Sequence, residues 1–126
     1  MNRVIVVGGG ASGLMAAAAA ASRGAKTILL EKNDRCGKKL SICGKGRGNV
    51  TNTADKDAFI AAFGKGGRFL YSAFSVFFRD ELLLQLEKLG IDTVAERGGR
   101  VFPSTQKAAS VTDALVKWCR DEGVRI

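Results

Sequence analysis

Histidine is absent from this 126-residue sequence, and its absence excludes a large part of enzyme chemistry. Without histidine the chain cannot build a Ser-His-Asp triad, a Cys-His nucleophile pair, a histidine general base or a histidine-containing zinc site. Any proton transfer must therefore come from a carboxylate, lysine, tyrosine or cysteine side chain, or from a bound cofactor. No residue is assigned a catalytic role from the sequence.

Cysteine is scarce, and long apolar runs are absent. The three cysteines, Cys36, Cys43 and Cys119, are an odd number without C-x-x-C spacing, so they indicate neither a secreted disulfide framework nor a zinc site. The apolar N-terminus resembles a signal peptide, but four glycines interrupt it, and no run of about 18 apolar residues occurs elsewhere. We expect a cytoplasmic protein without a bound metal or a membrane span.

Positive charge is abundant and unevenly placed. The chain has 20 lysines and arginines against 12 acidic residues, a net charge of +8, and residues 32–68 hold nine basic residues against three aspartates. Such a segment attracts phosphate, on a nucleotide cofactor or on a nucleic acid backbone, although a solvated loop gives the same composition. We expect a nucleotide cofactor and a small-molecule substrate, with RNA binding as the alternative.

The first 31 residues carry the pattern of a strand, a helix and a second strand. Residues 4–7 (VIVV) are typical of a strand buried on both faces of a parallel sheet. The alanine-rich residues 12–23 favour a helix that Gly24 ends, and residues 26–31 favour the second strand. The unit takes about 28 residues, close to the minimum for a right-handed crossover. We therefore predict a Rossmann-like α/β domain with a parallel sheet.

Weaker patterns follow in the rest of the chain. Residues 32–53 have little periodicity and predict a long loop, which in a compact domain is usually functional. The remaining patterns predict helices within residues 55–63, 68–78, 82–89 and 110–118, the last starting at a capping box of Ser110 and Asp113, and a hairpin over residues 91–102. Residues 124–126 begin a third parallel strand, so we expect residues 1–126 to be the N-terminal part of a longer domain.

The turn after the first strand fits the dinucleotide-binding pattern G-x-G-x-x-G. Gly8 permits the tight turn, Gly10 lets a pyrophosphate approach the backbone, and Gly13 lets helix and strand pack closely. Ala11 and Ser12 open the helix, whose free N–H groups face the phosphates. We therefore predict an FAD- or NAD(P)-binding site at this turn.

An acidic residue stands where the pattern requires one. Glu31 follows Gly13 by 18 residues and ends the second strand, where a carboxylate accepts hydrogen bonds from ribose hydroxyls. A carboxylate also repels a 2′-phosphate, so the site suits FAD or NAD better than NADP, although the neighbouring Lys32 tempers this argument. The pattern does not separate FAD from NAD.

A second glycine-rich segment, residues 37–52, reads GKKLSICGKGRGNVTN. Its glycines permit close backbone approach, while Lys39, Arg47, Asn49 and Thr51 supply groups that bond phosphate, ribityl or carbonyl groups. Together with VIVVGGGASGLMAA, LLEKN and GGRVFPSTQKAASVTDAL, this segment resembles the bacterial BaiN-like flavoproteins, also labelled aminoacetone oxidase family FAD-binding enzymes. The resemblance spans nearly the whole chain but only the N-terminal part of such a protein.

The resemblance implies an FAD-dependent oxidoreductase with NAD(P)H as reductant. It implies that Gly8, Gly10, Gly13 and Glu31 hold the ADP half of FAD, and that Lys39, Gly46, Arg47 and Asn49 lie along the pyrophosphate, ribityl chain or flavin ring. The family usually has serine and glycine where Cys43 and Lys45 stand, and cysteine where Gly48 stands.

Other interpretations of the sequence remain open besides an FAD-dependent oxidoreductase. The chain is also compatible with half of an NAD-dependent dehydrogenase. Cys36 and Cys43 invite comparison with the redox-active dithiol of flavin disulfide reductases, but six residues separate them where those enzymes have four. The aromatic residues between 69 and 78 favour core packing, or the lining of an inserted domain, over a platform for stacking bases.

Overall fold

The structure is a computed structural model that describes all residues from 1 to 126. Strand β1 (Arg3–Val7), helix α1 (Ala11–Ala21) and strand β2 (Lys26–Leu30) form the predicted unit, with β1 parallel to β2 from Arg3 opposite Lys26 to Val7 opposite Leu30. Arg125 forms a parallel bridge to Ile28 at the start of the predicted third strand. The Rossmann-like α/β fold and its parallel sheet are confirmed.

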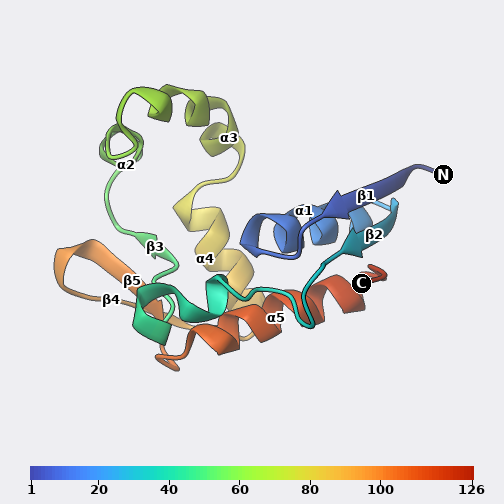
Figure 1. The fold of residues 1–126 in the computed structure, drawn as a ribbon. Coiled ribbons are helices and arrows are strands. Elements are labelled where there is room, and N and C mark those ends of the chain that lie inside the picture. The colour runs from blue at the N-terminus through green and yellow to red at the C-terminus, as the bar shows by residue number, and fades with distance from the viewer.

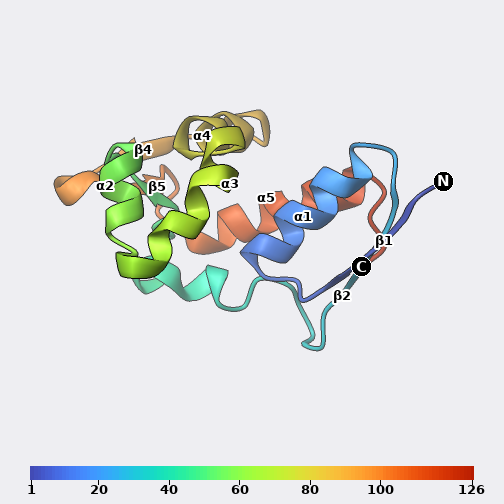
Figure 2. The same ribbon diagram turned by 90° about the horizontal axis from the view of Figure 1, so that it is seen from above.

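One face of this sheet is covered by α1 and by α5 (Ala108–Asp121), which lie side by side in Figures 1 and 2. Ala17 and Ala18 are completely buried, because their small side chains let the two helices approach closely. The thiol of Cys119 is also fully buried and donates a hydrogen bond to the carbonyl oxygen of Leu14, at 3.2 Å. Cys119 is therefore a core residue, as predicted.

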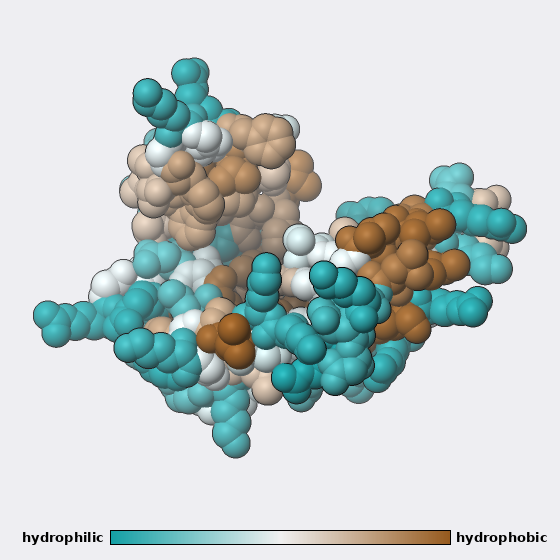
Figure 3. All heavy atoms as spheres, viewed as in Figure 1, coloured by the Kyte–Doolittle hydropathy of each residue, from teal (hydrophilic) through white to brown (hydrophobic).

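The opposite face of the parallel sheet is open. Ile5 and Val7 of β1 are 65% and 83% exposed, and Leu30 of β2 is 51% exposed. Figure 3 shows hydrophobic residues gathered over this part of the molecule. The continuous apolar character of both strands predicts burial on two faces, and this chain covers one of them.

The segment expected to be a loop over residues 32–53 is partly regular. It contains the 3₁₀ segment η1 (Leu40–Gly46), which lies along α5, and strand β3 (Thr51–Asn52). Strand β3 joins the predicted hairpin of β4 (Thr93–Ala95) and β5 (Arg100–Pro103), which η3 (Arg97–Gly99) connects, in an antiparallel sheet of order β3-β5-β4. The loop prediction was wrong here because a two-residue strand has no periodicity to detect.

The remaining elements form an arch above the antiparallel sheet (Figure 1). They are α2 (Lys56–Ala61), η2 (Gly64–Leu70) and α3 (Tyr71–Val76), followed by α4 (Arg79–Lys88). Inside the arch, Phe59, Phe74 and Phe78 contact one another with ring centroids 4.9–5.7 Å apart. Phe69, Tyr71 and Phe77 are exposed, so the core packing predicted for the aromatic residues between 69 and 78 is found only for Phe74 and Phe78. None of the helices combines the length and apolar character that crossing a membrane requires.

Helix α5 begins earlier than predicted. Its N-cap is Lys107, which makes no side-chain capping bond, and Ser110 lies inside the first turn. The Ser110 hydroxyl donates to the carbonyl oxygen of Lys107 at 2.7 Å instead of capping the helix. The predicted capping box was therefore wrong, because a serine in the first turn has a local backbone acceptor that the sequence pattern does not distinguish from a cap.

Candidate functional site

The turn between β1 and α1 depends on glycine for close contact. Gly8 has φ +101° and donates its N–H to the carbonyl oxygen of Leu30 at 2.8 Å, which joins the turn to the end of β2. A Cβ atom on Gly13 would lie 1.8 Å from the carbonyl oxygen of Gly8. Only glycine therefore allows the first turn of α1 to sit against the end of β1.

A carboxylate holds the middle of this turn. Glu31 Oε1 accepts a hydrogen bond from the N–H of Gly9 at 2.9 Å, and Oε2 accepts from the backbone N–H and the side-chain Nδ2 of Asn33, at 2.9 and 3.0 Å. The backbone N–H groups of Asn33 and Gly9 hold the pKa of Glu31 below its usual range. The side chain is therefore ionised at neutral pH and fixed beside the turn.

Gly9 also binds the loop that follows β2. Its carbonyl oxygen accepts from the N–H of Gly37 at 2.7 Å, and a Cβ atom on Gly9 would lie 2.6 Å from the Cys36 sulfur. Gly37 in turn packs against Thr112 of α5, 2.4 Å from the place of its missing Cβ. Sequence reasoning missed Gly9, because it occupies a free position of the pattern; the signal was a third consecutive glycine beyond what the pattern needs.

The three cysteines are free thiols. Cys36 is buried beneath Gly9, and burial together with the charge of Glu31 raises the pKa of its thiol. A protonated, buried thiol is a packing group and a poor nucleophile. Cys43 lies in η1, so the structure gives no support to a dithiol formed by Cys36 and Cys43.

The N-terminus of α1 presents unused hydrogen-bond donors. Gly10 is the N-cap and provides no side-chain capping bond, and the N–H groups of Ala11, Ser12 and Gly13 have no acceptor in the chain. A Cβ atom on Gly10 would meet nothing within 4 Å. Three N–H groups at the positive end of the helix dipole, with open space before them, can bind a phosphate group.

One cavity lies beside Glu31, and another lies at the N-terminus of α1. A cavity of about 310 Å³ beside Glu31 is lined by polar and charged residues that include Asn33, Asp34 and Arg120. A second cavity of about 260 Å³ brings Ala11 and Ser12 of α1 together with Asn49. The structure thus brings together predicted site residues that are far apart in the sequence. The second cavity is mainly apolar, and its other walls come from Met15, Leu40, Val50, Phe77, Leu82, Leu86, Val111 and Leu115.

Asn49 follows a second glycine-rich loop, residues 44–48, whose backbone is packed against the antiparallel sheet. A Cβ atom on Gly44 would lie 2.7 Å from the backbone nitrogen of Asn49, and one on Gly48 would lie 3.0 Å from the Cα atom of Ala108. With its amide oriented as the neighbouring carbonyl oxygens require, the Asn49 nitrogen donates to the carbonyl oxygens of Thr51 and Val101, at 3.0 and 3.3 Å. The loop therefore has a defined place beside the cavity.

Arg47 is held by its own chain. Its guanidinium forms an ion pair with Glu96, donates from Nε to Gln106 Oε1 at 2.9 Å, and stacks on Phe102 with 4.0 Å from Cζ to the ring centroid. The Arg47 guanidinium holds the pKa of Glu96 below its usual range. The structure thus places Arg47 in an internal cluster, where its charge is balanced.

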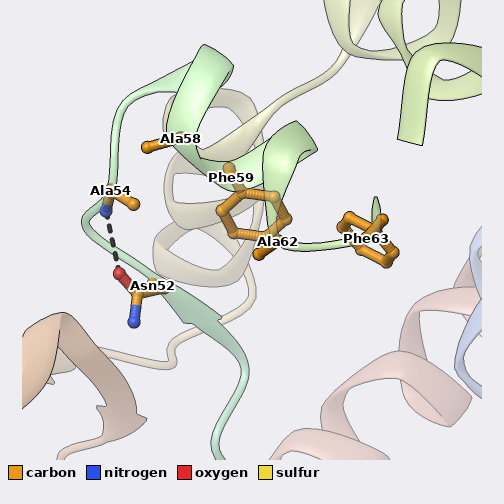
Figure 4. Close-up of a pocket in the computed structure, with 6 residues that line it drawn as sticks. All are labelled: Asn52, Ala54, Ala58, Phe59, Ala62 and Phe63. Atoms are coloured by element: carbon orange, nitrogen blue, oxygen red, sulfur yellow. Dashed lines mark hydrogen bonds between the residues drawn. The ribbon is translucent and has the colours of Figure 1, made fainter. Parts of the chain in front are cut away.

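The other predicted basic and glycine positions are open. Lys32 and Lys39 are exposed and form no ion pair, and Gly46 is exposed with φ +83° and open space where its Cβ would be. These residues lie at the surface of the loops that carry Glu31 and Asn49. No predicted site residue lies in the cavity of Figure 4, about 350 Å³ in volume, which Asn52, Ala54, Ala58, Phe59, Ala62 and Phe63 line.

Comparison with known proteins agrees with the Rossmann-like fold. The sequence profile of the HI0933-like protein Rossmann domain matches residues 2–126. The chain is 39% identical over 103 residues to a 3-dehydro-bile acid delta(4,6)-reductase of Clostridium scindens, which covers 81% of this chain and 24% of the reductase. The chain therefore spans about a quarter of this curated relative.

The fold is also similar to that of a solved structure. The crystal structure of Thermovibrio ammonificans THI4 superposes with a TM-score of 0.60 and 16% sequence identity, over 98% of this chain and 36% of that one. At this identity the similarity concerns the fold alone.

Proposed function

The chain belongs to the HI0933-like Rossmann domain family, and from that premise we propose that it forms the N-terminal, FAD-binding part of a flavin-dependent oxidoreductase that uses NAD(P)H as reductant. The observation that carries the proposal is the joint arrangement of Glu31 and the α1 N-terminus around Gly9 and Gly10. One carboxylate and three unused N–H groups flank the same turn.

The residues present fit a dinucleotide. A carboxylate has about four acceptor positions on its two oxygens, and Glu31 uses three of them within the chain, which leaves one on Oε1 for a ribose hydroxyl. The N–H groups of Ala11, Ser12 and Gly13 would hold the pyrophosphate, with Gly10 leaving room for it. Asn49 and the apolar cavity beside Ala11 would receive the remainder of the cofactor.

FAD is favoured over NAD by the second glycine-rich loop. The dinucleotide turn serves either cofactor, but the loop that carries Gly46 and Asn49 adds a second contact region beside the same helix end. When bound, FAD supplies hydride chemistry at its flavin ring. The reductase name of the Clostridium scindens relative supports the same reaction class, with a small molecule as substrate.

We prefer a nucleotide to RNA as the partner of the basic segment. Two of its cations are balanced within the chain, Lys38 by Asp34 and Arg47 by Glu96. These ion pairs make the electrostatic attraction between the segment and a nucleic acid backbone weaker than the composition alone indicates. RNA affinity that falls steeply with salt concentration would contradict this preference.

The test is the absorption spectrum of the protein purified from its complete reading frame, with the released cofactor identified by mass. We expect a flavin spectrum and the mass of FAD, and reduction of the flavin by NADH or NADPH. Gly10→Ala should purify with much less FAD than wild type, while Gly66→Ala, at an exposed glycine with equal space around its Cβ position, should retain it. A colourless protein that carries NAD would refute the proposal.

A further inference from the structure

The loop of residues 44–48 has a left-handed backbone over three of its residues. Gly44, Lys45 and Gly46 have φ of +58°, +57° and +83°, so three consecutive residues are left-handed, and one of them is a lysine. Left-handed backbone is unfavourable for any residue with a Cβ atom. Contacts from outside therefore add to the local hydrogen bonds that the N–H groups of Arg47 and Gly48 donate, and help the loop to keep this shape.

Those contacts converge on Arg47, the next residue. Its guanidinium donates from Nη2 to both Glu96, which lies between β4 and β5, and Gln106, which precedes α5, and from Nε to Gln106 as well. Phe102, only 2% exposed, lies under the guanidinium plane. The partners are 49 and 59 residues away in the sequence, so they tie the loop to the antiparallel sheet and to the start of α5.

Gln106 is itself left-handed, with φ +58°. Its backbone N–H donates to the carbonyl oxygen of Pro103 at 2.9 Å, and its side-chain oxygen faces Arg47. Of the two non-glycine residues with positive φ, Lys45 thus lies two residues before Arg47 in the loop, and Gln106 binds the Arg47 guanidinium. Strained backbone persists only where the surrounding structure holds it, so the Arg47 contacts are placed to stabilise both segments.

We propose that Glu96 and Gln106 are positioning residues that hold Arg47, and through it the loop of residues 44–49, in the shape that presents Asn49 to the proposed FAD site. The inference rests on the proposed function. It replaces the sequence expectation that Arg47 itself contacts the cofactor. Arg47 is two residues from Asn49 and has its charge balanced by Glu96, so its effect on the site is exerted through the backbone.

The test is a double-mutant cycle of Arg47→Ala and Glu96→Ala, with the FAD dissociation constant of the complete protein measured by flavin fluorescence. If the pair acts as a unit, each single variant weakens FAD binding by about tenfold, and the double variant is no weaker than either. If Arg47 contacts FAD directly, Glu96→Ala leaves the affinity unchanged, and the inference is overturned. Failure of the wild-type protein to bind FAD would instead overturn the proposed function.

A pH profile separates positioning from general stability. Glu96 is faced by the cations Arg47 and Arg100 and by the neutral Gln106. Glu96→Gln removes the charge and keeps an acceptor, so it matches the protonated wild type. We expect wild type to bind FAD more tightly than Glu96→Gln at pH 7 and the two affinities to converge only as the pH falls through the lowered pKa of Glu96, which lies below 4.5. Equal affinities throughout this range would contradict the inference, even where both variants fold equally well.

Discussion

The turn of residues 8–13 and the loop of residues 44–48 both depend on glycine, but they use their backbone in different ways. In the turn, the N–H groups of Ala11, Ser12 and Gly13 have no acceptor in the chain. In the loop, the N–H groups of Arg47 and Gly48 donate to Gly44 and Cys43, at 3.1 and 3.0 Å. The turn therefore has donors for a ligand, whereas the loop uses its donors to maintain its own shape.

Each of the two is also held by a distant carboxylate. Glu31 binds the backbone of Gly9 directly, whereas Glu96 binds the side chain of Arg47. A backbone contact fixes the turn with little freedom, while a contact through a long side chain leaves the loop dependent on a whole cluster. Single substitutions in the turn should therefore have large effects on stability or FAD affinity, whereas single substitutions in the loop should have smaller effects.

The largest expected effect is that of Gly13→Ala. The new methyl carbon would lie 1.8 Å from the carbonyl oxygen of Gly8, and neither backbone segment can move without separating α1 from β1. We expect a loss of about 3 kcal/mol or more in the free energy of unfolding. Urea unfolding followed by circular dichroism measures this loss. A variant as stable as wild type would show that the helix end is less closely packed than described.

Gly10→Ala should separate binding from folding. Gly10 has φ −81°, which suits alanine, and its Cβ would meet no atom of the chain. The midpoint of thermal unfolding should therefore change by only a few degrees, as expected for about 1 kcal/mol at a helix N-cap. FAD affinity should fall by about a hundredfold, because the methyl group takes the space before the free N–H groups. An unchanged FAD dissociation constant would place the pyrophosphate elsewhere.

Glu31→Gln should weaken both the turn and the cofactor site. Glutamine supplies one acceptor oxygen, so its amide nitrogen would face either the N–H of Gly9 or the donors of Asn33. We expect FAD affinity to fall by about tenfold or more, because hydrogen bonds to a charged group are lost. Asn33→Ala is the control, since it removes one donor and leaves the bond to Gly9.

The pH dependence of the turn has a definite sign. The folded-state pKa of Glu31 lies below its ordinary value of 4.5. The stability contributed by its ionised form is therefore present above pH 4.5 and is lost as the pH falls through the lower folded value. Wild type should lose stability in this range relative to Glu31→Gln, which has no carboxylate at that position to titrate. Parallel stability curves for the two proteins would exclude a role for Glu31 ionisation.

The comparison also shows how far the sequence predicts the structure. The turn was predictable because its residues are local: a buried strand, glycines at fixed spacing and an acid at the end of the next strand. The loop was not, because β3 exists only through its pairing with β5, and Arg47 finds Glu96 and Gln106 only after the hairpin forms. Gly9 was missed because its importance comes from Cys36 and Glu31, which close over it from the following loop.

The smallest expected effect concerns Lys45 and Gly46, which share a left-handed backbone. Lys45→Gly removes a strained Cβ atom, and the greater freedom of glycine in the unfolded chain offsets part of the gain, so we expect a stabilisation of about 0.5 kcal/mol. Gly46→Ala introduces the same strain at the next residue and should destabilise by about 1 kcal/mol. Lys45 is exposed, and a Cβ atom on Gly46 would meet nothing within 4 Å, so side-chain packing does not affect either variant. Opposite shifts in the urea midpoint would support a loop limited by backbone strain, whereas shifts of the same sign would show that its outside contacts decide its stability.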